Sequence, residues 1–206
     1  MFLNIDQHST HKLAAKDSLG GEVTYGNLKE FSVEFGKLIE SRSLIFILAK
    51  NTIGGLSGYY GSLENRIVPL ILGTDLEDGL LLNLWKQYQP NYAWLPLESE
   101  KFNKIEHSII WEIQGYQLIK FDHPKPELYC DLSLLLSTSG STGSPKLVRH
   151  SYENISSSAK NVAALFEITD QDRALVTLPL QYTMGLSVVT SYLFAGATVL
   201  LTDLSL

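Results

Sequence analysis

The chain has 206 residues, of which 45% are hydrophobic and 18% charged, and its net charge is −6. This length and composition are typical of one domain with a substantial core. Its basic residues are not clustered, so we expect neither a nucleic-acid partner nor a charged membrane surface. One cysteine, Cys130, no apolar run near the ~18 residues of a membrane span, and no signal-peptide pattern together indicate a cytoplasmic protein.

The apolar pattern predicts helices and strands that alternate along the chain. Thr24 can cap a helix, because apolar residues recur after it at helical spacing. The continuous apolar run 44–49 is typical of a strand that is buried on both faces. The apolar positions of the first helix are Leu28, Phe31, Phe35, Leu38 and Ile39. The other predicted elements are helices at 51–65, 76–88, 152–166 (capped by Ser151) and 184–194, and strands at 67–72, 92–95, 107–113, 116–121, 132–136, 173–178 and 197–202.

This order of elements predicts the fold class. Strand, helix and strand in succession indicate an α/β protein with a mainly parallel sheet and helices on both faces. Pro124 and Pro126 mark a linker, with a possible sub-boundary near residues 122–131.

The stretch STSGSTGSPK, residues 137–146, follows the predicted strand 132–136 and precedes the predicted helix 152–166. Its glycines allow close approach of the backbone to a ligand, its hydroxyls can donate, and its lysine suits phosphate. Ligands of parallel sheets bind beyond the carboxyl ends of strands, so we predict a phosphate-binding loop. An ordinary surface loop is the alternative, since Gly, Ser and Thr are common in loops. The candidate binding residues are Thr138, Ser139, Gly140, Ser141, Thr142, Gly143 and Lys146.

Two familiar motifs do not fit this stretch. In G-x-x-x-x-G-K-[ST] the lysine directly follows the second glycine, whereas Ser144 and Pro145 separate Gly143 from Lys146 here. No serine lies in a G-x-S-x-G pattern, so a hydrolase elbow is unsupported.

Nine consecutive residues, 138–146, resemble the signature of the AMP-binding, adenylate-forming superfamily, which includes acyl-CoA synthetases, peptide-synthetase adenylation domains and luciferases. That signature reads T-S-G-S/T-T-G-x-P-K-G, followed by a histidine ahead of a helix, and here His150 and Asn154 follow. Further segments resemble the family in the same order: 23–28 its T-Y-x-E-L helix start, 179–186 its P-L-x-H-x-x-G-L segment, and 196–199 its G-A-T-V strand.

The resemblance implies an ATP-dependent ligase that activates a carboxylic acid as an acyl adenylate and usually transfers it to a thiol, on CoA or a carrier protein. Lys146 and the loop would hold the β- and γ-phosphates and stabilise the departing pyrophosphate. Tyr182 would be an aromatic gate between nucleotide and acid. Magnesium would assist, with its carboxylate ligand outside this chain. Among the residues present the sequence shows no ligand spacing for a metal cluster.

The chain departs from the family pattern at two positions. Leu147 replaces the glycine that usually follows the lysine, at a cost of ~1–2 kcal/mol if the backbone there is left-handed. Tyr182 replaces the histidine common in acyl-CoA synthetases, so a flat ring remains but imidazole chemistry does not. Tyr182 can instead be a core aromatic, and His150 can simply orient the loop.

The later family motifs, namely Y-G-x-T-E, the ribose aspartate of T-G-D and the lysine of a small mobile domain, do not occur in these residues. We therefore expect residues 1–206 to be the N-terminal portion of an adenylation domain, inactive alone and prone to self-association. Two other hypotheses stay open: a non-catalytic nucleotide-binding or structural fragment, and, less consistent with the motifs, a different phosphate-loop NTPase.

Overall fold

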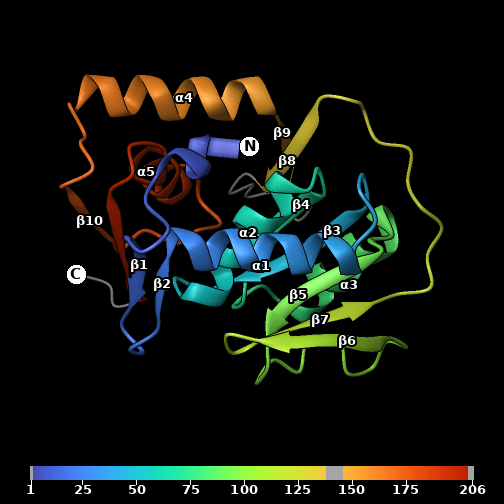
Figure 1. The fold of residues 1–206 in the computed structure, drawn as a ribbon. Coiled ribbons are helices and arrows are strands. Elements are labelled where there is room, and N and C mark those ends of the chain that lie inside the picture. The colour runs from blue at the N-terminus through green and yellow to red at the C-terminus, as the bar shows by residue number, and fades with distance from the viewer. Residues whose placement is uncertain (1, 138–145, 204–206) are drawn as a thin grey trace.

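The computed structural model describes residues 2–137 and 146–203, which form two sheets with helices packed around them (Figure 1). Its elements are η1 Phe2–Gln7, β1 Leu13–Asp17, β2 Glu22–Thr24, α1 Tyr25–Leu38, β3 Leu44–Ala49, α2 Ile53–Glu64, β4 Val68–Gly73, α3 Asp78–Tyr88, β5 Tyr92–Pro96, β6 Ser108–Ile113, β7 Tyr116–Lys120, β8 Leu132–Ser137, β9 Leu147–Ser151, α4 Tyr152–Leu165, β10 Arg173–Val176, α5 Thr183–Phe194 and β11 Thr198–Leu201.

The larger sheet has seven strands in the order β6-β7-β5-β3-β4-β8-β9. Its four inner strands, β5, β3, β4 and β8, run parallel, and antiparallel strands flank them on both sides. The predicted α/β class with a mainly parallel sheet is therefore confirmed. The strands are divided between two sheets, because β10 and β11 pair with β1 and β2 in a separate sheet ordered β10-β11-β1-β2.

Strand β3 shows why helices cover both faces of the larger sheet. Its side chains are buried throughout, as its continuous apolar run predicts. Ile45 and Ile47 belong to the core that contains α1, α2, α4 and α5. Phe46 and Leu48 point into a second core against α3, and no helix other than α3 contributes buried side chains to that core within the described residues.

The helix ends follow the local sequence. The Thr24 hydroxyl accepts a hydrogen bond from the Asn27 backbone N–H, and the Asn27 side chain accepts one from Thr24 in return, which completes a capping box. The Ser151 hydroxyl caps α4 through the Asn154 N–H, as predicted. The glycines of α2 permit close packing: a Cβ at Gly58 would lie 2.2 Å from the Trp94 ring.

The structure shows a strand that the sequence did not predict, between Lys146 and the following helix. Helix α4 begins at Tyr152 as predicted, and β9 occupies the interval after Lys146. Strand β9 pairs antiparallel with β8, with Ser137 opposite Leu147. The sequence did not indicate β9, because LVRHS is short and partly polar and lies at the outer side of the sheet.

The four-stranded sheet joins the two ends of the described chain. Strand β1 pairs parallel with β11, with Ala15 opposite Val199, and antiparallel with β2. Asp17 at the end of β1 is buried, and its carboxylate accepts hydrogen bonds from the backbone of Gly21 and Ile53. This carboxylate thereby fastens the small sheet to the N-terminus of α2, where the helix dipole favours a negative charge.

The predicted linker around Pro124 and Pro126 lies in residues 121–129, which form no helix or strand and connect β7 with β8 of the same sheet. The sub-boundary there stays a prediction. No helix in the described ranges is long and apolar enough to cross a membrane.

Candidate functional site

The predicted loop residues Thr138, Ser139, Gly140, Ser141, Thr142 and Gly143 lie outside the described residues, and Lys146 lies within them. Lys146 is exposed and immediately precedes β9. Because Ser137 pairs with Leu147, the lysine backbone lies at the carboxyl end of β8. This is the side of a parallel sheet on which ligands bind.

The carboxyl ends of β3, β4, β5 and β8 meet at one side of the sheet, which we call the carboxyl edge. The segment after β10 crosses this edge, since a Cβ added to Gly73, the last residue of β4, would lie 2.8 Å from the Gln181 side-chain amide. Residues from both sheets therefore converge near the predicted phosphate site.

Tyr182 stands at the N-cap of α5, at the end of a tight turn. Its backbone N–H donates to the carbonyl of Pro179 at 3.0 Å, and its side chain is 52% exposed. The alternative of a core aromatic is thus inconsistent with this position. Gly185 allows the turn to fold back onto α5, because a Cβ there would lie 2.5 Å from the Pro179 oxygen and 2.6 Å from that of Leu178.

Asn51, directly after Lys50 at the carboxyl end of β3, is the polar residue that links this turn to the larger sheet. Its side chain is buried, with Nδ2 donating to the carbonyls of Val176, Leu178 and Thr202 at 3.2, 3.1 and 3.0 Å. Its Oδ1 accepts from the Leu180 N–H at 3.1 Å. The sequence showed Asn51 only as the start of a predicted helix, and an isolated asparagine gives no further signal.

His150 on β9 lines a cavity of about 90 Å³ between β8, α4 and α5. Its Nε2 atom is buried and has no hydrogen-bond partner among the described residues. Burial lowers the pKa of the imidazole below its ordinary value, so the ring is neutral near pH 7. Buried polar groups of this kind commonly bind an ordered water. That His150 orients the loop stays a prediction.

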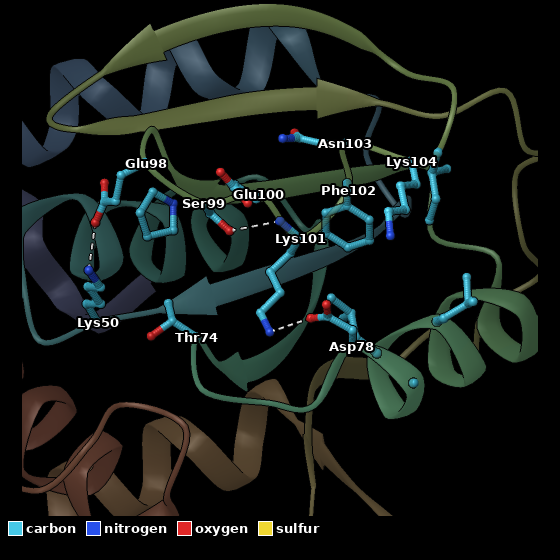
Figure 2. A pocket seen from close by; sticks show the side chains of 15 residues that line it. Lys50, Thr74, Asp78, Glu98, Ser99, Glu100, Lys101, Phe102, Asn103 and Lys104 are labelled. Atoms are coloured by element: carbon cyan, nitrogen blue, oxygen red, sulfur yellow. Dashed lines mark hydrogen bonds and ion pairs between the residues drawn. The ribbon is translucent and has the colours of Figure 1, made fainter.

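A larger cavity of about 910 Å³ opens at the same edge, beside the ends of β3, β4 and β5 (Figure 2). Lys50 reaches across it to Glu98 at 2.6 Å, and Lys101 extends to Asp78 at 2.6 Å. Hydrogen bonds from these lysines hold the pKa of the Glu98 and Asp78 carboxyls below their ordinary values.

The charges around this cavity balance. Its lining includes three lysines and three carboxylates, among them Lys104 and Glu100, so the wall carries no net positive charge that would attract a polyanion. The sequence did not indicate this cavity, because its walls come from the ends of three strands, from the first turns of α3 and from residues 98–105. The balanced charge of this wall does not favour a phosphate ligand.

Within residues 2–137 and 146–203, no group of three His, Cys, Asp or Glu side chains is placed to hold a metal ion. The described residues therefore show no cluster that would hold a magnesium ion by protein ligands alone.

The family model of the AMP-binding enzymes matches residues 4–205. The chain belongs to this family. The solved structures support the same fold: the apo form of MatB from Rhodopseudomonas palustris has a TM-score of 0.78 at 18% identity, with 98% of this chain and 45% of that chain covered. O-succinylbenzoate coenzyme A synthetase (MenE) from Bacillus subtilis, in complex with AMP, has a TM-score of 0.77 at 22% identity, covering 99% of this chain and 55% of that chain.

Among curated proteins, the chain is similar to 2-succinylbenzoate–CoA ligase from Escherichia coli, with 28% identity over 159 residues. This alignment covers 77% of the chain and 34% of that ligase. The Bacillus subtilis enzyme of the same name is 43% identical over 111 residues, or 51% of this chain and 23% of the ligase. The chain therefore spans about a third or less of the curated relatives it matches.

Proposed function

We propose that this chain supplies the phosphate-binding part of an ATP-dependent ligase that activates a carboxylic acid and passes it to a thiol. The observation that carries the proposal is the nine-residue signature 138–146, which begins directly after β8 at the carboxyl edge. The family match and the names of the CoA ligases support it. CoA is the acceptor that these names favour over a carrier protein.

The reaction has two balanced steps. A carboxylate oxygen attacks the α-phosphorus of ATP, the bond between that phosphorus and the bridging oxygen breaks, and pyrophosphate leaves. The thiolate of the acceptor then attacks the carbonyl carbon of the acyl adenylate, and AMP leaves with the electron pair of the broken carbon–oxygen bond.

In this proposal Lys146 contacts the β- and γ-phosphates, where its charge stabilises the negative charge that develops on the departing pyrophosphate. The loop hydroxyls and N–H groups add hydrogen bonds to the same oxygens. Tyr182 contributes a ring with an exposed polar tip between nucleotide and acid, in place of the imidazole found in many relatives. Magnesium, when bound, would neutralise phosphate charge through ligands outside the described residues.

Binding of ATP and of pyrophosphate to the 206-residue chain, measured by isothermal titration calorimetry, tests the first part of the proposal. We expect Lys146→Ala to weaken pyrophosphate binding by about 1–3 kcal/mol, the range of a hydrogen bond to a charged group. Lys160→Ala is the matched control, because it removes one positive charge from the exposed surface of α4.

Equal binding by the native chain and Lys146→Ala would remove Lys146 from the site. Pyrophosphate exchange by a longer protein that contains this chain tests the second part, with a panel of carboxylic acids. Nucleotide binding without any acid-dependent exchange would favour the non-catalytic alternative.

A further inference from the structure

We infer that Asn51 is a positioning residue for the acid-binding side of the proposed site, because its carboxamide sets the place of the turn that carries Tyr182. This inference rests on the proposed function only for the consequence on catalysis. The structural part concerns how two separate sheets are held together at the carboxyl edge.

The hydrogen bonds of Asn51 all connect β3 of the larger sheet with the smaller sheet and its following turn. Strands β10 and β11 end beside it, and the carbonyls of Val176, the last residue of β10, and of Thr202, directly after β11, accept from the Asn51 Nδ2 group. The backbone N–H of Asn51 also donates to the carboxylate of Asp203 at 2.8 Å. One side chain thus fixes the ends of three strands from two sheets.

The Asn51 carboxamide also forms hydrogen bonds with the backbone of the turn before α5. Leu178 accepts from its Nδ2 and Leu180 donates to its Oδ1, so both sides of Pro179 are tied to the end of β3. Tyr182 closes the turn by donating to Pro179, and Leu186 in turn donates to the carbonyl of Tyr182. Displacement of Leu180 would therefore move Tyr182 and the first turn of α5 together.

An asparagine suits this position chemically. A carboxamide presents donors and an acceptor from one planar group, whereas an aspartate presents only acceptors when ionised. Three of the partners are carbonyl oxygens, so an ionised carboxylate would face like partial charges in a buried place. The side chain is 1% exposed, which leaves water little access to substitute for a lost bond.

Asn91 offers a matched control, since it is a second buried asparagine, 7% exposed, at the opposite edge of the same sheet. Its Nδ2 donates to the carbonyls of His123 and Pro124 at 3.0 and 3.1 Å, and its Oδ1 accepts from the Leu44 N–H at 3.4 Å. Loss of Asn91 removes comparable hydrogen bonds and leaves the Tyr182 turn untouched.

Deuterium uptake of the native 206-residue chain, followed by mass spectrometry, tests the structural part. In Asn51→Ala we expect uptake in residues 178–186 to become roughly tenfold faster or more, with β3 and α4 unchanged, because local opening controls the exchange of these amides. Asn91→Ala is expected to leave uptake in residues 178–186 unchanged. Asn51→Asp keeps the side-chain volume and the acceptor for Leu180, and we expect it to lose protection in the same peptides.

Native protection of residues 178–186 in either Asn51 variant would overturn the inference. Faster uptake spread evenly over the whole chain would also overturn it, because that result describes a residue needed only for global stability.

The catalytic consequence is measured in a longer protein that contains this chain and performs acid-dependent pyrophosphate exchange. We expect Asn51→Ala to lower kcat/KM for the acid more than kcat/KM for ATP, since the Asn51 side chain is hydrogen-bonded to the turn that carries Tyr182, whereas Lys146 directly precedes β9. An equal loss for both substrates would count against the positioning role. Absence of exchange in the unmodified longer protein would defeat the proposed function, while the deuterium result would still decide whether Asn51 positions the turn.

Discussion

In the seven-stranded sheet, buried asparagines form similar hydrogen bonds at the amino ends and at the carboxyl ends of the parallel strands, but the segments that they hold differ in exposure. At the amino ends of the parallel strands, which we call the amino edge, Asn91 donates a hydrogen bond to a backbone carbonyl of the segment before β8. Arg42 donates one to the carbonyl of Leu132, the first residue of β8, at 2.7 Å. At the carboxyl edge, Asn51 also binds backbone carbonyls, but the turn it holds presents the exposed ring of Tyr182. At the amino edge these hydrogen bonds hold a connecting segment against the sheet. At the carboxyl edge the buried Asn51 side chain holds a turn whose Tyr182 ring faces solvent, and a binding site requires exposed groups that are held in place in this way.

The largest expected effect is on catalysis, and it follows from the catalytic groups that the carboxyl edge of this chain does not supply. We expect ATP–pyrophosphate exchange by the 206-residue chain alone to be undetectable with any carboxylic acid. The ribose aspartate, magnesium carboxylate and catalytic lysine of the family are not recognisable in its sequence, and each such charged partner contributes a factor of about 10²–10³. Exchange near the rate of a longer protein that contains the chain would show that the catalytic groups have been misplaced.

A second prediction concerns the exposed apolar side chains beside this edge, Leu175, Leu178, Tyr182 and Met184. Leu175 lies on β10, an outer strand of the four-stranded sheet, so we expect the chain to self-associate with rising concentration in sedimentation velocity. Leu175→Glu should raise the concentration needed roughly tenfold or more, because burial of a leucine contributes about 1.5–3 kcal/mol.

Leu19→Glu is the control for this prediction, since Leu19 is 81% exposed and lies between β1 and β2, away from β10. A chain that remains monomeric at all concentrations, or equal effects of the two variants, would exclude this surface as the cause.

Two glycine substitutions test how tightly the turn of the carboxyl edge is packed. Gly185→Ala should lower the free energy of unfolding by about 1–3 kcal/mol, because the new Cβ would collide with the carbonyls of Leu178 and Pro179. Gly79→Ala in α3 meets nothing within 4 Å and should raise stability by up to about 1 kcal/mol. Urea unfolding of both variants measures the difference, and a neutral Gly185→Ala would show that the turn can shift.

The smallest expected effect is a pH dependence from His150. Burial lowers its pKa in the folded chain, so the unfolded chain binds more protons in the range between the folded pKa and about 6.5. Stability should therefore fall as the pH drops through this range, and His150→Gln should remove that part of the fall. Thermal unfolding at pH 7.5 and 5.5 provides the measurement, with the exposed His11→Gln as control. The same pH response in the native chain and His150→Gln would contradict the assignment.

The sequence predicted the elements whose signals are local. The run 44–49 reads as a doubly buried strand because its neighbours on both faces are apolar, and Thr24 and Ser151 cap their helices through bonds only three residues away. It missed β1, β2 and β9, which are short and partly polar. Their pairing partners, rather than their composition, make them strands.

The residues of the candidate site likewise fall into those that a local sequence signal predicts and those that only tertiary contacts reveal. The phosphate signature and the segment containing Tyr182 could be found from consecutive residues. Asn51 and the cavity of Figure 2 could not be found, because each depends on the meeting of strand ends that are far apart in the chain.

The pairing of β1 with β11 has a consequence for the order in which the chain folds during synthesis. The Thr198 hydroxyl donates to the carbonyl of Leu13, a residue 185 positions earlier. Strand β1 therefore leaves the ribosome long before its parallel partner exists, while β3, β4 and β5 can already pair with one another. Because distant contacts close slowly, we expect β3, β4 and β5 to pair before β1 meets β11, while β1 is held meanwhile by β2 and by the bond of Asp17 to the N-terminus of α2.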